Sequence, residues 1–114
     1  MTTNAEQTER LTWLSYELEQ RIERFLHGDI DARALADQVA SMTSYDEVDN
    51  LADPLVMHTF WAAQHMQHRP ACWAPTREEL EYLLLCLRGE EVFDPEQLDF
   101  TYQNTPRQGA QNDC

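Results

Sequence analysis

The sequence contains no lysine: its 8 basic residues are all arginine, and they stand against 21 Asp and Glu. The formal net charge of −13 on 114 residues exceeds what the solubility of a small domain requires. Such a charge repels nucleic acid and anionic membranes and attracts basic proteins. We therefore expect a basic protein partner and no direct binding to nucleic acid or membrane. A GC-rich genome, a salt-rich habitat and ordinary solvation of helix faces are the competing explanations for the acidity.

Glycine and cysteine are also scarce. Three scattered glycines exclude a phosphate-binding glycine loop. The spacings of Cys72, Cys86 and Cys114 match neither a disulfide framework nor a zinc-binding Cys pair. No apolar run approaches the roughly 20 residues that span a bilayer, and no N-terminal segment suggests export. These absences predict a cytoplasmic protein with reduced thiols and without a cofactor.

Apolar residues recur at helical spacing through most of the chain, and no segment has the alternation or turn chemistry of a strand. The predicted fold class is all-α, a compact bundle of four principal helices with a short C-terminal turn and a polar tail. The helices are expected over residues 5–27, 31–43, 54–68 and 76–88. Residues 5–100 are expected to form a single domain, with flexible termini at 1–4 and 101–114.

Capping signals set these boundaries. Gly28 and Gly89 are placed to end helices, since glycine adopts the left-handed conformation without strain. Helix starts are indicated at Asp29 or Asp31, at Asp53 before Pro54, and at two capping boxes, Ser44–Glu47 and Thr76–Glu79. A short turn is expected around Val48 and Leu51, and a last single turn after Asp94. The inward face of the first helix is expected to comprise Leu11, Leu14, Leu18, Ile22, Phe25 and Leu26.

Imidazole and thiol groups are concentrated in the helix expected at 54–68 and just beyond it. His58 and His65 would lie two turns, about 10 Å, apart, so one zinc ion could not join them. His65, His68 and Cys72 are the candidate ligands for any metal, although no HExxH pattern is present. The prediction is no metal site. The alternatives are an exposed contact face that includes Trp61, or packing against a neighbouring helix.

Aromatic and acidic residues supply the candidate contacts with a partner. Trp13 and Tyr16 fall outside the leucine stripe of the first helix, where they either anchor an interface or cover another part of the chain. The acidic residues of segment 46–53 lack the spacing, central glycine and terminal glutamate of an EF-hand loop. The predicted partner-binding residues are Trp13, Tyr16, Asp46, Glu47, Asp49, Asp53, His58, Trp61, His65 and Trp73. No nucleophile–base pair has a recognisable context, so we predict that the protein is not an enzyme.

Two motifs carry a family resemblance over residues 22–88. The run from Phe25 to Ala32 links two helices as F-L-x-G-x-I-x-A, and Thr76-Arg77-Glu78-Glu79-Leu80 opens a later helix. In these motifs the chain resembles small helical bacterial immunity proteins of the colicin-immunity type. The resemblance implies an inhibitor that occupies the basic active-site cleft of a nuclease toxin, and it assigns no binding residue here.

The leading hypothesis is an acidic binding protein that inhibits or sequesters a basic nucleic-acid-handling protein. Nucleic-acid mimicry is one way in which it could inhibit. A toxin-immunity protein and a phage anti-defence protein share these sequence features. One alternative is a self-associating structural or assembly module, in which a homodimer buries the aromatic face of the 54–68 helix. The other is a small His/Cys metal-binding protein.

Overall fold

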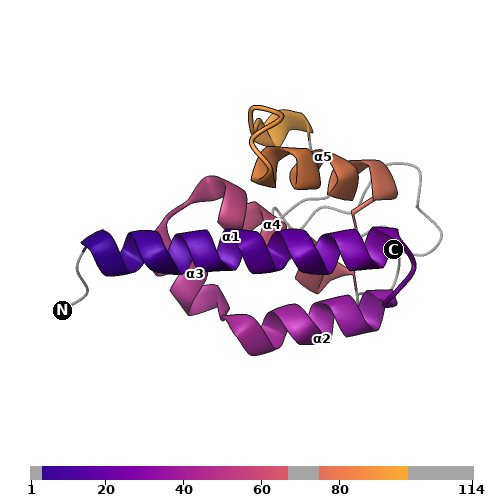
Figure 1. The fold of residues 1–114 in the computed structure, drawn as a ribbon, viewed down its shortest axis with the longest axis horizontal. Coiled ribbons are helices and arrows are strands. Elements are labelled where there is room, and N and C mark those ends of the chain that lie inside the picture. Colours follow the sequence, from indigo (N-terminus) through magenta and orange to yellow (C-terminus); the bar gives the residue numbers. More distant parts are fainter. Residues whose placement is uncertain (1–3, 67–74, 98–114) are drawn as a thin grey trace.

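The computed structural model describes residues 4–66 and 75–97, and the regular structure in these ranges is helical (Figure 1). The elements are α1 (Asn4–Leu26), α2 (Ala32–Met42), α3 (Tyr45–Leu51), α4 (Pro54–His65), α5 (Arg77–Leu87) and the 3-10 turn η2 (Pro95–Gln97). The all-α prediction is confirmed, with five α-helices rather than four, because the turn expected around Val48 is the seven-residue helix α3. No helix in the described ranges is both long enough and apolar enough to cross a bilayer.

Side chains at the predicted starts cap four of the helices, α2 to α5. Asp31 accepts a hydrogen bond from the Ala34 amide at 2.8 Å, and Asp53 accepts one from Val56 at 3.0 Å. Thr76 and Glu79 form the complete capping box, in which the Glu79 carboxylate accepts from the Thr76 amide at 2.7 Å and Thr76 Oγ1 accepts from the Glu79 amide at 3.1 Å. These local bonds satisfy amides that would otherwise lack an intrahelical partner.

The capping box predicted at Ser44 is only half formed. Ser44 Oγ accepts from the Glu47 amide at 3.1 Å, as expected. The Glu47 carboxylate, however, accepts hydrogen bonds from Arg10 and Thr43. A bidentate guanidinium is a stronger donor to a carboxylate than one backbone amide, so the tertiary contact replaces the local one.

Left-handed residues end three of the helices. Gly28 follows α1 with φ +85°, and Gly89 follows α5 with φ +76°, both as predicted. Ala52 takes the same conformation at the end of α3, with φ +56°, and its amide donates to the Val48 carbonyl at 3.2 Å. Of these three helix ends, only the one at Ala52 has no glycine in the sequence to predict it.

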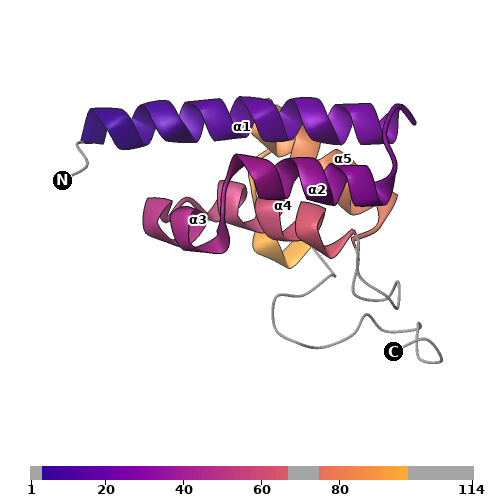
Figure 2. The ribbon, with the colours of Figure 1, turned by 90° about the horizontal axis from the view of Figure 1, so that it is seen from below.

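Helix α4 occupies the centre of the fold. It packs against α1, α2, α3 and α5, while α1 also lies along α2 and α5 (Figures 1 and 2). The first turns of α1 extend past the ends of the other helices in both views. The core collects the apolar faces of all five helices: Leu14, Leu18, Ile22, Leu35, Val39, Val48, Val56, Phe60, Ala62, Ala63, Leu80, Leu83 and Leu84. The middle of the predicted α1 stripe is fully buried, and Leu11, Phe25 and Leu26 at its ends are half-buried.

Both α2 and α4 carry buried small residues. Ala36 on α2 and Ala62 and Ala63 on α4 are buried. The amide of Gln64, also buried, donates to the Ala36 carbonyl at 2.9 Å and so joins the two helices by a side chain. The short side chain of Ala36 permits this approach, since a larger one would push the two helices apart.

Candidate functional site

The histidine and tryptophan residues of α4 do not form an exposed contact face. His58 is only 5% exposed, and its Nδ1 donates to the Pro54 carbonyl at 2.7 Å. The His58 ring lies 5.2 Å from the ring of Phe93 and 5.8 Å from that of Trp61. Trp61 is half-buried against the core. The predicted contact role of His58 is therefore corrected to packing, because α4 is enclosed by four other helices.

The proposed metal ligands are not brought together in the part of the chain that the structure describes. His65 is half-buried, and its Nδ1 donates to the Trp61 carbonyl at 2.7 Å. His68, Cys72 and Trp73 lie outside the described residues. Within residues 4–66 and 75–97, no three His, Cys, Asp or Glu side chains are grouped so as to hold a metal ion.

The acidic residues of segment 46–53 have separate roles. Asp53 caps α4 and is half-buried. Asp46 and Asp49 are exposed on α3. Glu47 turns toward α1 and pairs with Arg10. Of this predicted cluster, therefore, only Asp46 and Asp49 remain exposed.

Arg10 links the aromatic and acidic candidates. Its Nε and Nη2 donate to the two carboxylate oxygens of Glu47, each at 2.9 Å, and Nη2 also donates to the Met42 carbonyl at 2.7 Å. The guanidinium carbon lies 4.6 Å from the centre of the Trp13 ring, within cation–π range. The hydrogen bond from Arg10 lowers the pKa of Glu47 below its usual value, with a smaller contribution from Thr43. Glu47 is thus held ionised and in a fixed orientation.

An open groove separates the first turns of α1 from α3. Its volume is about 370 Å³, and the residues that line it are Glu6, Gln7, Arg10, Glu47, Asn50 and Leu51. Asp46 lies one helical turn before Asn50, so the spacing places it on the same side of α3. We call the groove together with Trp13 and Asp46 the α1–α3 surface. Tyr45 and Asp49, which are one turn apart, lie farther round α3 from the groove.

Both α1 and α3 also carry exposed aromatic side chains. Trp13 is 42% exposed on α1, and Tyr45 is 48% exposed on α3. The Tyr45 ring is held edge-on against Phe60, with centroids 4.8 Å apart. Tyr16, one turn beyond Trp13, is 56% exposed. Large aromatic rings that are both exposed and supported by packing are suited to bury area against a partner.

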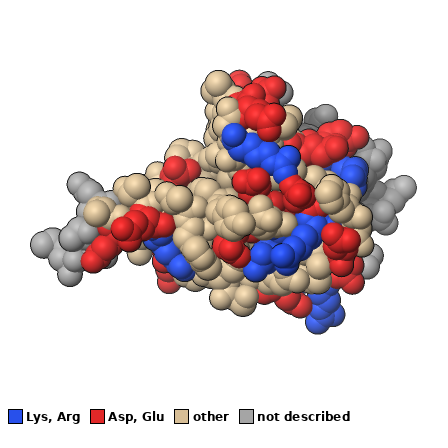
Figure 3. Space-filling view, viewed as in Figure 1, with Lys and Arg blue, Asp and Glu red and all other residues tan. Residues whose placement is uncertain are grey.

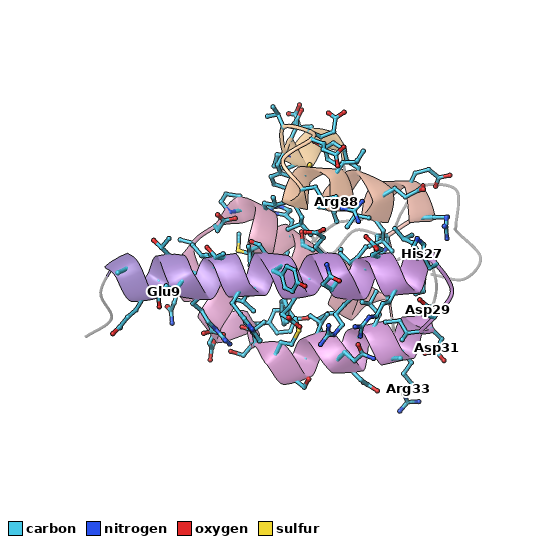
Figure 4. All side chains as sticks on the ribbon, viewed as in Figure 1. Glu9, His27, Asp29, Asp31, Arg33 and Arg88 are labelled. Atoms are coloured by element: carbon cyan, nitrogen blue, oxygen red, sulfur yellow. The ribbon has the colours of Figure 1, made fainter. Side chains whose placement is uncertain are left out.

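A second groove lies between the end of α1 and α5, with Leu26, Leu84 and Leu85 among its lining residues. Its cations are engaged within the protein. Arg88 pairs with Glu19 at 3.1 Å and also with Glu23, and Arg77 donates to the Leu26 carbonyl at 2.8 Å. Figure 4 shows Arg88 lying between α5 and α1. Opposite charges therefore balance here, unlike on the α1–α3 surface.

Most arginines in the described ranges form ion pairs or hydrogen bonds within the protein. The arginines engaged in ion pairs or hydrogen bonds are Arg10, Arg21, Arg33, Arg77 and Arg88. On the face shown in Figure 3, blue arginine atoms lie next to red carboxylate atoms. Because these cations are committed to internal partners, they are less able to offset the acids that face solvent.

Sequence reasoning missed Arg10 and Tyr45. No local pattern marks Arg10, because its carboxylate partner lies 37 residues away. Tyr45 lies inside the Ser44–Glu47 capping motif, in which only Ser44 and Glu47 match the capping pattern. The predicted candidates Trp13 and Glu47 are brought together through Arg10. No protein-family model, curated protein or solved structure matches this chain.

Proposed function

We propose that this protein is an acidic, non-enzymatic binding protein whose α1–α3 surface docks on a basic nucleic-acid-handling protein and inhibits or sequesters it. The observation that carries the proposal is that exposed carboxylates, Asp46 and Asp49, and exposed aromatic rings, Trp13 and Tyr45, occur on two helices that the Arg10–Glu47 pair joins. A toxin-immunity or phage anti-defence role is the class of function that this combination favours.

The two kinds of side chain would contribute differently to binding. Carboxylates attract a basic surface over long distances and speed association, and their attraction weakens as salt screens it. The aromatic rings contribute after contact, when burial of their area slows dissociation. Carboxylates at the site where a partner binds phosphates would also exclude nucleic acid, which makes inhibition a direct consequence of docking.

The test begins with capture on the immobilised full chain at low salt, elution in a salt gradient and purification of the eluted protein. Its affinity is then measured for the wild type, for Asp46→Asn/Asp49→Asn, and for the matched control Glu90→Gln/Glu91→Gln. Both double variants remove the same charge from exposed positions. We expect the α3 variant to bind about tenfold more weakly, from two lost ion pairs of up to about 1 kcal/mol each. The control should change affinity far less.

Two results would contradict the proposal. One is equal weakening by both double variants, which would mean that net charge alone sets the affinity. The other is a partner that binds nucleic acid and this protein at the same time without loss of affinity for either. Trp13→Ala should separately increase the dissociation rate more than it lowers the association rate.

A further inference from the structure

We propose that the groove between α1 and α3 receives an arginine side chain of the partner beside Arg10; this inference rests on the proposed function and assigns its ligand. The lining of the groove is net negative. Among the described residues that form it, the Glu6 and Glu47 carboxylates stand against the single guanidinium of Arg10. Asp46 adds a further carboxylate at the side of Asn50. A cation entering this space is therefore attracted before it makes any specific contact.

The surface already holds one guanidinium, which shows the geometry that it accepts. Arg10 meets Glu47 through two hydrogen bonds, reaches the Met42 carbonyl and lies over Trp13. The side chains of Arg10 and Glu47 remain 36% and 35% exposed, so this pair is open to the groove. A carboxylate offers about four lone-pair sites, of which Arg10 and Thr43 take three on Glu47. An entering donor can use the remaining site.

The acceptors favour arginine over lysine. They lie on two helices, with Glu6 on α1 and with Glu47 and the Asn50 amide on α3. A planar guanidinium with five donors can bridge acceptors on opposite walls, whereas an ammonium group acts as a compact and strongly hydrated charge. The half-buried Leu51 provides an apolar contact for the methylene stem. The groove thus matches both ends of an arginine side chain.

Two short peptides of equal length and charge test the inference, one alternating serine with arginine and the other alternating serine with lysine. Each is titrated into the full-length ¹⁵N-labelled protein, and amide shifts are followed by NMR. We expect the arginine peptide to bind several-fold more tightly and to shift the amides of Gln7, Asn50 and Leu51. Glu6→Gln should weaken this binding about two- to fivefold, as expected for one partly exposed ion pair. Asn50→Ala, which leaves the charge unchanged, should reduce the preference for arginine over lysine.

Glu9→Gln is the matched control, because Glu9 is an exposed glutamate of the same helix that does not line the groove. Equal weakening by Glu6→Gln and Glu9→Gln, or equal affinity for both peptides, would overturn the inference. Shifts that centre on Glu90 and Glu91 would also overturn it. The peptides decide only what the groove binds. The Asp46→Asn/Asp49→Asn measurement with the protein partner decides the proposed function, so the failure of one can be told from the failure of the other.

Discussion

Arg10 on α1 and Glu47 on α3, which are 37 residues apart in the sequence, are joined by two hydrogen bonds of 2.9 Å. This pair connects the extended first turns of α1 to α3. It also places Trp13, which underlies the guanidinium, next to the helix that carries Asp46 and Asp49. The α1–α3 surface therefore depends on one long-range ion pair for its shape.

A double-mutant cycle should measure that dependence. We expect Arg10→Ala and Glu47→Ala each to lower the free energy of unfolding by about 1–2 kcal/mol, with a coupling energy of about 1 kcal/mol, because the bidentate pair is only partly exposed. Urea unfolding followed by circular dichroism supplies the values. The Arg33–Asp37 pair, at 3.9 Å and largely exposed, is the control. Its coupling should stay below about 0.5 kcal/mol, and a comparable coupling in both cycles would contradict the special role of Arg10.

The Arg10–Glu47 pair should also make stability depend on pH. Arg10 lowers the pKa of Glu47 in the folded protein below its ordinary value of 4.5. The stabilisation is therefore present above the unfolded-state pKa and is lost as the pH falls through the lower folded-state pKa. We expect the wild type to exceed Glu47→Gln in unfolding free energy at neutral pH, and the difference to shrink in acid. Urea titrations across the acidic range test this, and a constant difference would count against it.

The capping box of α5 provides a prediction with a control of the same residue type. Thr76→Ala removes the acceptor of the Glu79 amide, and we expect it to cost about 1 kcal/mol of stability. Thr12 on α1 is exposed, and its hydroxyl donates to the Thr8 carbonyl inside the helix. Thr12→Ala should change stability by less than about 0.5 kcal/mol, since alanine is the better helix former there. Thermal or urea unfolding of the two variants should separate them clearly, and equal losses would contradict the capping role.

The packing of four helices around α4 predicts intolerance to larger side chains in its buried positions. Ala63→Leu should destabilise the protein by about 1–3 kcal/mol, because Ala63 is fully buried and the added methyl groups have no space. Ala40→Leu, at an exposed position of α2, should remain within about 0.5 kcal/mol of the wild type. A stable Ala63→Leu protein with unchanged unfolding free energy would show that the helices packed around α4 can move apart without cost.

Prediction from sequence succeeded wherever the signal was local. Gly28, Asp31, Asp53 and Thr76 mark helix ends that the structure confirms. Caps act within one turn of the chain, so residues a few positions apart contain the information. The α1 stripe was predictable for the same reason, since helical periodicity identifies a face without identifying what covers it.

Placement of the helices could not be obtained in this way. The residue pattern of α4 left open whether His58 faces solvent or a neighbouring helix. In the structure the surrounding helices bury it, so His58 is a packing residue. The Ser44 capping box was altered when Arg10 took over the Glu47 carboxylate. Both outcomes depend on segments that are distant along the chain.

The sequence by itself determined an acidic chain of helices, with most of their ends and inward faces, because charge, capping and periodicity are properties of neighbouring residues. That Trp13 and Glu47 both contact Arg10, beside a groove between α1 and α3, follows only from the arrangement of the helices in space. The physical reason is that contacts across helices depend on how the buried faces pack together. That packing is a property of the whole fold.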